Sequence, residues 1–292
     1  MKKIEITDYA ESWQFSIENF KIILGDNKYR LYRSLYHQLA KEEVSEFESE
    51  QDERLEIKIN GQKYDLKVNR IFSLNMFSNF DEEIKLSSKS LLIEYLDAQL
   101  KDVDYQDVFI MLNQSIELIN QELLDEINVE SNETRVAFSL QPFTLKSLIK
   151  NTIAEIYKND LHACDFDLKL IEKIRLYLKT MVCIADKNQA RHYFVLVVLD
   201  EMSPIIYDEI KGINKNNLQL IVFVNLINCI VEYQDIYMIG KLKMDFGDDE
   251  SIYENLVIEK GIALDLPDSK RILVEYCKNP KGTSRFSSIF TE

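Results

Sequence analysis

The sequence predicts an α/β protein whose mostly parallel sheet is built from both ends of the chain, with a helical segment inserted between them. Three predominantly apolar runs predict buried strands, at Phe20–Leu24, Tyr193–Leu199 and Leu218–Val224, and the second of these is continuous. A parallel strand covered on both faces shows such a run because neither of its faces meets water. Between the first run and the second, apolar residues recur every three or four positions, which is typical of helices. From Tyr193 onward a strand, a helix and a strand follow within about 30 residues, the length of a βαβ unit.

Length and composition allow one large or two modest domains. The chain has 292 residues, of which 46% are hydrophobic and 29% charged. We predict an α/β head whose first part is 1–101, with a hairpin at 55–68, then a helical leg at 102–189. The second part of the head is 190–292 and includes a C-terminal extension. No apolar run reaches the roughly 20 residues that span a bilayer, and the first residues lack the apolar core of a signal peptide. We therefore expect a cytoplasmic protein that is not in the membrane.

The first part of the head contains short strand candidates. Lys2–Thr7 and Trp13–Ile17 precede the first buried run, and Ile71–Met76 follows the hairpin. The hairpin, Leu55–Val68, alternates apolar and polar residues around Asn60-Gly61. Asn-Gly tolerates the positive φ angles of a type I′ turn, so this segment predicts two antiparallel strands. A helix is expected at about 87–101.

The leg and the second part of the head are predicted from periodicity and from capping residues. Three helical stripes are expected, formed by Val108, Leu112, Ile116, Ile119 and Leu123, by Leu145, Ile149, Ile153 and Ile156, and by Leu170, Ile174, Leu178 and Met181. Arg135–Leu140 is a short strand candidate. Ser203-Pro204 predicts the start of a helix that runs to about Lys211. Lys241–Phe246 is predicted as a third strand of the βαβ region, and Leu256–Leu264 and Arg271–Tyr276 as weaker strand candidates.

The turn after the first buried strand is the position of a phosphate loop in a nucleotide-binding α/β protein. Phe20–Leu24 ends at Gly25-Asp26 and leads into a helix predicted at Asn27–Ala40. A phosphate loop needs several glycines and a Lys followed by Ser or Thr. Only Gly25 is present here. The architecture that carries nucleotide chemistry is therefore predicted without the residues that perform it.

Other sequence patterns of catalysis or metal binding are weak. Asp200-Glu201 follows a buried strand, as a Walker B pair does, and leaves a divergent nucleotide hydrolase as an alternative function. The four cysteines and three histidines show none of the spacings of a zinc site. We predict free thiols, no catalytic residue, no metal and no cofactor.

Charge is distributed unevenly along the leg, although the net charge of the chain is −15. Residues 92–133 contain eleven acids and one lysine, whereas residues 141–191 contain nine bases and six acids. The pairs Lys146/Lys150 and Lys169/Lys173 are four residues apart, so each pair lies on one helix face. The basic helices could pair with the acidic ones, or they could bind a phosphate backbone without reading sequence. The acidic face could also serve a protein scaffold, which is a second alternative.

A second basic cluster lies on the helix after the first buried strand. It combines three cations with Tyr29 and Tyr32, a mixture that suits nucleic acid but also an ordinary amphipathic helix. The residues predicted from charge clustering to bind DNA are Lys28, Arg30, Arg33, Lys146, Lys150, Lys169 and Lys173.

Four segments resemble the accessory adaptation protein of type II-A CRISPR systems, the Csn-two family. They are the strand and helix of Phe20–Ala40, the strand and turn Ile71–Asp81 with the helix Leu86–Leu100, the segment Phe143–Lys150 with the leg helices, and the strands Phe194–Leu199 and Leu218–Val224. Together they cover about residues 15–247. They match in the order of strand, turn and helix with a few shared residues.

The resemblance implies an α/β head similar to a degenerate P-loop fold, with a helical leg. It implies a homotetrameric ring that binds double-stranded DNA ends in its central hole through lysines. It implies a non-enzymatic role in spacer acquisition, together with the integrase proteins and the effector nuclease of the CRISPR system. Shorter members resemble calcium-dependent rings with acids before the third segment. Ser139-Leu140-Gln141-Pro142 departs from that pattern, and the extra residues 248–292 indicate one of the longer subtypes.

Overall fold

A computed structural model of the chain describes residues 1–8, 11–40, 56–65, 70–75, 78–86, 90–101, 106–124, 129–131, 134–136, 138–240, 243–253, 255–256 and 265–278. These residues divide into two compact units. The sheet unit comprises Met1–Ser78 and Leu168–Glu292, and the arm unit comprises Asn79–Asp167. The predicted leg, 102–189, therefore differs from the observed unit at both ends. None of the described helices combines the length and the hydropathy that crossing a bilayer requires.

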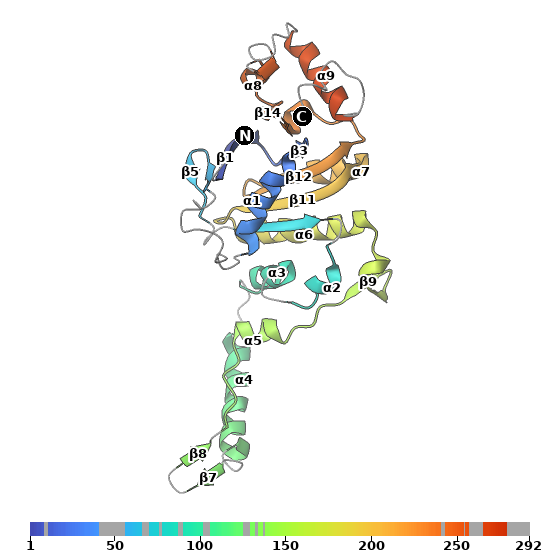
Figure 1. Ribbon diagram of the computed structural model, residues 1–292. Helices are drawn as coiled ribbons and strands as arrows, with labels where there is room; N and C mark the ends of the chain where they lie inside the picture. The colour runs from blue at the N-terminus through green and yellow to red at the C-terminus, as the bar shows by residue number, and fades with distance from the viewer. Residues whose placement is uncertain are drawn as a thin grey trace. The chain divides into compact units, whose positions relative to one another are not determined.

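The sheet unit contains most of the strands (Figure 1). Its strands are β1 (Lys2–Asp8), β2 (Glu11–Ile17), β3 (Phe20–Leu24), β4 (Glu56–Ile59), β5 (Gln62–Lys63), β6 (Arg70–Asn75), β11 (Tyr193–Met202), β12 (Leu218–Ile227), β13 (Ile236–Ile239) and β14 (Lys243–Asp245). Its helices are α1 (Lys28–Ala40), α6 (Leu170–Lys187), α7 (Pro204–Lys211), the 3₁₀ turn η3 (Tyr233–Asp235), α8 (Asp249–Tyr253) and α9 (Leu266–Lys278).

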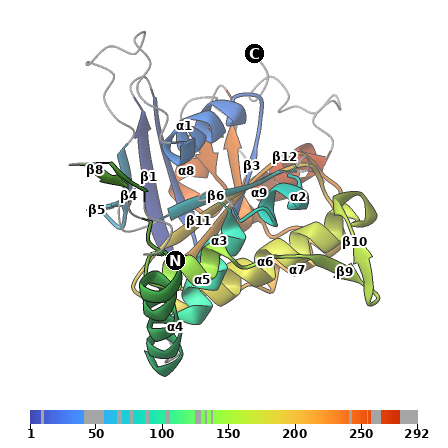
Figure 2. The ribbon, with the colours of Figure 1, turned by 90° about the horizontal axis from the view of Figure 1, so that it is seen from below.

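Six strands form the central sheet in the order β14-β13-β3-β12-β11-β6. The neighbours from β13 to β6 are parallel, and only the edge strand β14 is antiparallel. The apolar runs that predict β3, β11 and β12 are buried along almost their whole length. Helix α1 covers one face of this sheet, while α6 and α7 lie on the other (Figure 2). The predicted α/β class with a largely parallel sheet is confirmed.

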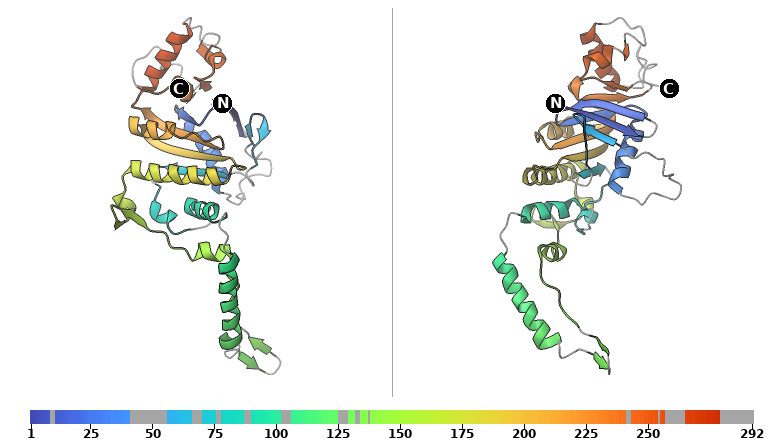
Figure 3. Two further views of the ribbon diagram at one scale, coloured as in Figure 1. Left: turned by 180° about the vertical axis from the view of Figure 1, so that it is seen from behind. Right: turned by 90° about the vertical axis from the view of Figure 1, so that its left-hand side faces the viewer.

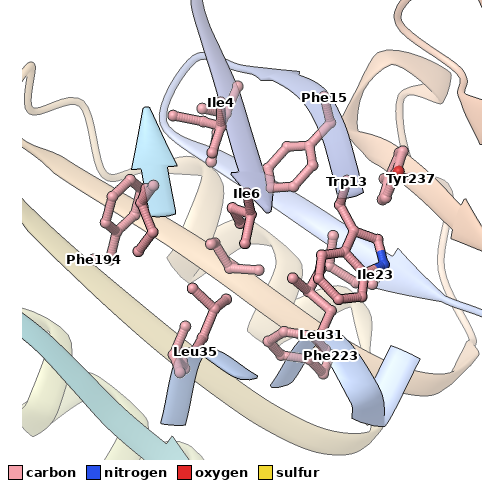
Figure 4. Packing of buried hydrophobic residues seen from close by; sticks show 14 of the residues in the cluster. Ile4, Ile6, Trp13, Phe15, Ile23, Leu31, Leu35, Phe194, Phe223 and Tyr237 are labelled. Carbon is pink, nitrogen blue, oxygen red and sulfur yellow. The ribbon is translucent and has the colours of Figure 1, made fainter. Parts of the chain in front are cut away.

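A second, antiparallel sheet of order β2-β1-β4-β5 packs against the α1 side. Figure 4 shows Trp13 and Phe15 of this sheet in one cluster with Leu31 of α1 and Phe223 of β12. The hairpin between β4 and β5 turns through Asn60 and Gly61, whose φ angles are 51° and 76°. These positive angles confirm the predicted type I′ turn.

Buried polar side chains of the sheet unit, among them Lys21 and Asn217, join distant segments. The Lys21 ammonium, fully buried, donates to Asp245 Oδ1 at 2.5 Å and to the Gln234 carbonyl at 2.7 Å. The Asn217 side-chain amide donates to the carbonyls of Ala185, Asn188 and Arg191, at 2.9, 3.3 and 3.1 Å. It satisfies carbonyls at and beyond the end of α6 that have no partner within the helix.

The arm unit is formed by short elements and one longer helix. In chain order these are α2 (Phe80–Glu83), α3 (Leu91–Leu100), α4 (Gln106–Ile119), the π-helical turn η1 (Asn120–Leu124), β7 (Val129–Ser131), β8 (Thr134–Val136), α5 (Leu145–Lys150), β9 (Ile156–Lys158), β10 (Leu161–Ala163) and the 3₁₀ turn η2 (Asp165–Asp167). After β8 the chain runs back along α4 as an extended segment (Figure 3). Asn113 on α4 pairs with the backbone of Phe143, and Asn120 at the start of η1 pairs with the backbone of Leu140, so both asparagines bind that segment.

Several predicted elements are wrong in extent or type. The helical stripe from Leu145 to Ile156 ends at Lys150, because the Asn151 and Thr152 side chains hydrogen-bond back to the last turn, and β9 follows. The strand predicted at Arg271–Tyr276 is part of α9, in which Ser269, Leu273 and Cys277 recur every four residues as buried positions.

The remaining differences concern boundaries and one strand. Helix α3 begins after Ser90, whose hydroxyl accepts from the Leu92 amide, and 87–89 lie outside the described residues. The third predicted strand, Lys241–Phe246, is the antiparallel edge strand β14. Strand β13, which pairs with β3, was not predicted. The strand candidate at 256–264 lies almost wholly outside the described residues.

Candidate nucleic-acid interface

The turn between β3 and α1 is closed to a phosphate by the neighbouring strand. Gly25 has φ of +102°, and a Cβ at this position would lie 2.0 Å from the Ile239 carbonyl oxygen at the end of β13. The Asn27 amide, which opens α1, donates to the same carbonyl at 3.4 Å. An acceptor oxygen therefore lies where a phosphate loop presents N–H donors to an anion. Gly25 is required by this close backbone approach.

Lys28 turns back toward the same turn. The residue is 6% exposed, and its ammonium donates to the Gly25 carbonyl at 3.1 Å and lies 4.6 Å from the centroid of the Tyr29 ring. Burial lowers the pKa of this lysine, while the nearby Asp26 carboxylate acts in the opposite direction. A buried ammonium with these contacts disagrees with the predicted role of Lys28 as a surface contact to DNA.

The two arginines of the α1 cluster are exposed, but both have partners. Arg30 forms an ion pair with Glu11, and Glu11 also binds Lys243 at 3.0 Å. Arg33 is exposed and takes part in a further interaction. A contact between Arg30 and a phosphate would have to displace the Glu11 carboxylate.

The two acids near the end of β11 are held by asparagines. Asn225 donates to Asp200 Oδ1 at 3.2 Å and accepts from the Tyr29 hydroxyl at 3.0 Å, and Asn228 donates to Glu201 Oε1 at 2.7 Å. These contacts connect the carboxyl ends of β11 and β12 with α1. Within the part of the chain that the structure describes, no group of three or more His, Cys, Asp or Glu residues could hold a metal ion.

Two lysines of the predicted set lie in the arm unit. Lys146 and Lys150 are exposed, one turn apart on α5, while Ile149 of the same helix is buried. The Thr144 hydroxyl caps α5 by accepting from the Ser147 amide at 3.2 Å. Neither lysine forms an ion pair with another described residue. These two ammonium groups are therefore available to an anion.

The other two predicted lysines belong to the sheet unit. Lys169 is exposed just before α6, and its backbone N–H donates to the Glu172 carboxylate at 2.7 Å. Lys173 is half-buried on α6 and takes part in another interaction. The predicted set is thus split between two units. Lys179 is also exposed on α6, one turn after Arg175, whose guanidinium pairs with Glu209 at 2.6 Å.

The fold is similar to a solved structure. No protein-family model matches the sequence, and comparison with curated proteins gives no significant match. The crystal structure of Stu0660 of Streptococcus thermophilus is similar with a TM-score of 0.70 and 17% sequence identity, over 99% of this chain and 91% of that chain. At this identity the likeness shows a shared fold over nearly the whole of both chains.

Proposed function

We propose that the protein is a non-enzymatic ring that binds double-stranded DNA ends, as an accessory adaptation protein of a type II-A CRISPR system in the cytoplasm. The observation that carries the proposal is the exposed pair Lys146 and Lys150 on α5, two cations that pair with no described acid. Two ammonium groups one helical turn apart suit the regularly spaced phosphates of a duplex, and such contacts do not depend on sequence.

The net charge of the chain is compatible with this function. A ring can gather basic side chains in its hole and present acids to the outside, so a total of −15 does not exclude binding to DNA. The four segments that resemble the Csn-two family support the assignment, and the fold shared with Stu0660 supports its architectural part, an α/β protein with a helical insertion. In this setting the partners would be the integrase proteins and the effector nuclease.

The arm unit supports assembly into a homotetramer. No described side chain of α4 is fully buried, and Val108, Ile110, Met111 and Leu118 are each more than half exposed. A helix with such an exposed apolar face is stabilised when a second copy of the chain covers it, because apolar surface is then removed from contact with water.

The turn after β3 favours binding of DNA over turnover of a nucleotide. The Ile239 carbonyl lies against Gly25, and Lys28 is bound to its own turn. The phosphates of a nucleoside triphosphate at this turn would meet the Ile239 carbonyl oxygen instead of amide donors. We therefore prefer the DNA-binding function to the nucleotide hydrolase that Asp200-Glu201 left open.

The test is duplex binding against salt for two matched variants. The variant Lys146→Ala/Lys150→Ala removes the unpaired lysines. The control, Lys85→Ala/Lys101→Ala, removes two lysines of the same unit that pair with Glu82 and Asp97. Each phosphate contact contributes about 0.9 to the slope of log affinity against log salt concentration, so the first variant should lower the slope by about 2 for each protomer whose two lysines reach the duplex, and the control should not. Equal slopes for wild type and the first variant would remove the basis of the proposal.

The ring is tested with one plasmid in two forms. A protein that threads onto ends should bind the linearised plasmid and leave the covalently closed circle unbound at the same salt. Light scattering should give the mass of a tetramer. A monomer, or equal binding to both forms, would contradict the ring.

A further inference from the structure

One exposed face of α1 carries two tyrosines seven residues apart. Tyr29 is 46% exposed and Tyr36 is 45% exposed, whereas Leu31 and Leu35 on the opposite side are buried in the core. At 100° per residue, positions 29, 33 and 36 fall within an arc of about 60°. Arg33, also exposed, therefore lies between the two rings on the same face.

Contacts with the sheet hold these rings in place. The Tyr29 hydroxyl donates to Asn225 Oδ1 at 3.0 Å. Tyr36 stacks on Tyr32 with centroids 5.5 Å apart and an interplanar angle of 27°, and the Tyr32 hydroxyl lies 3.2 Å from Ser73 Oγ. Because the rings are already ordered, a ligand that stacks on them loses little side-chain entropy.

The spacing of the rings matches stacked bases. Seven residues of helix rise about 10 Å, which is close to three nucleotides at about 3.4 Å each. The Lys28 ammonium near the Tyr29 ring adds positive charge under this face. Nearby acids partly cancel the cations, since Glu11 pairs with Arg30 and Asp8 accepts from the Ser34 hydroxyl. Stacking, more than charge, would then supply the affinity.

We propose that this face of α1, formed by Tyr29, Arg33 and Tyr36, binds single-stranded nucleic acid by stacking bases on the tyrosine rings. Every base has a π face, so such binding is tolerant of sequence. This site is separate from the lysines of the duplex interface. It would hold an unpaired overhang or a frayed end.

The test is the affinity of a labelled oligo-deoxythymidine of about 15 nucleotides, within the range that one single-strand binding module covers. Tyr36→Leu and Tyr29→Leu should each weaken binding at least about fivefold, because stacking of one base is lost. Tyr36→Phe keeps the ring and should bind within about twofold of wild type. Tyr253→Leu, which removes a 56% exposed tyrosine on α8, is the remote control and should have no effect.

A second readout locates the contact. An oligonucleotide carrying 5-bromodeoxyuridine should cross-link under ultraviolet light to the peptide that contains Tyr29 or Tyr36. Wild-type affinity in the double Leu variant would overturn the proposal, as would a cross-link elsewhere only. A change of oligomeric state without loss of oligonucleotide binding would make this face a protein interface and equally refute the inference. The double Leu variant should still bind blunt duplex, so this result is independent of the lysine test.

Discussion

The buried pair of Lys21 and Asp245 allows a prediction in which a second substitution repairs the first. In Asp245→Asn the Lys21 ammonium loses its negatively charged partner and keeps only neutral acceptors such as the Gln234 carbonyl, at a position with no exposed surface. Removing one partner of a buried pair costs about 3–5 kcal/mol, largely because the other charge is left without compensation. Adding Lys21→Met removes that charge. The double variant should therefore be more stable than Asp245→Asn alone.

The size of the recovery follows from the contacts of Asp245. Its carboxylate also accepts from the Ser16 amide at 2.7 Å and from the Gly247 amide at 2.9 Å. Asparagine keeps an oxygen for one of these donors, so part of the loss remains in the double variant. We expect a coupling free energy of about 2 kcal/mol between the two sites, at the upper part of the range for contacting residues.

The pH dependence gives an independent check. Burial lowers the pKa of Lys21, and Asp245 is the main opposing influence. A lysine with a depressed native pKa releases its proton more readily when folded, so stability rises with pH between that pKa and the unfolded value. Without Asp245 the native pKa falls further. Stability of Asp245→Asn should therefore rise from about pH 7 to pH 9 more steeply than that of wild type.

The assay is urea unfolding followed by the emission of Trp13, the single tryptophan, which is 1% exposed in the sheet unit. Midpoint and slope give the free energy of unfolding for wild type, both single variants and the double variant. If the double variant is less stable than Asp245→Asn, or if Asp245→Asn lies within about 1 kcal/mol of wild type, the reasoning on uncompensated buried charge fails.

Three further predictions concern single positions. Burial raises the pKa of Asp235 to about 6, so the wild type should lose stability as the pH rises from about 4 to 6. At pH 7.5 the variant Asp235→Asn should be more stable than the wild type by about 1–2 kcal/mol, a figure that allows for solvent screening. Below about pH 4 the two proteins should be equally stable. Urea unfolding at several pH values tests this, and a constant difference would refute it. Asn217→Ala orphans the Ala185 carbonyl in the last turn of α6 and should cost about 2–3 kcal/mol in the same assay; a loss below about 0.5 kcal/mol would contradict it. Gly25→Ala would clash with Ile239 and should lower the melting temperature far more than Gly61→Ala, since both have positive φ but only Gly25 is crowded.

The sequence predicts best those elements whose pattern is local. The apolar runs of β11 and β12 and the Asn60-Gly61 turn can be recognised without knowledge of the neighbouring elements. Ser203 and Pro204 likewise begin α7 as predicted, with the Ser203 hydroxyl accepting from the Ile206 amide. In each case a few adjacent residues determine the conformation.

Elements that depend on distant partners were missed. Strand β13 has four residues and owes its place to pairing with β3, about 215 positions earlier in the chain. The burial of Lys28 also depends on β13, since the end of that strand closes the turn against which the lysine lies. Charge clustering alone could not separate this buried lysine from the exposed Lys146 and Lys150. Separating them required the tertiary contacts.

The sequence pattern at Gly25 correctly predicts a turn that something approaches closely, but the group that approaches is not a phosphate. A glycine between a buried strand and a helix suggests a phosphate loop, because an anion must approach the backbone closely. Here a backbone atom makes that approach instead, and the Ile239 carbonyl occupies the space that a Cβ would need. A phosphate that binds beside this turn would therefore have to be held by side chains on helix surfaces. Side-chain cations bind a phosphate backbone without the fixed geometry of an amide cradle, so such binding would be tolerant of sequence and sensitive to salt. The salt slope of the Lys146→Ala/Lys150→Ala variant is thus the measurement that separates a DNA-binding ring from a nucleotide enzyme.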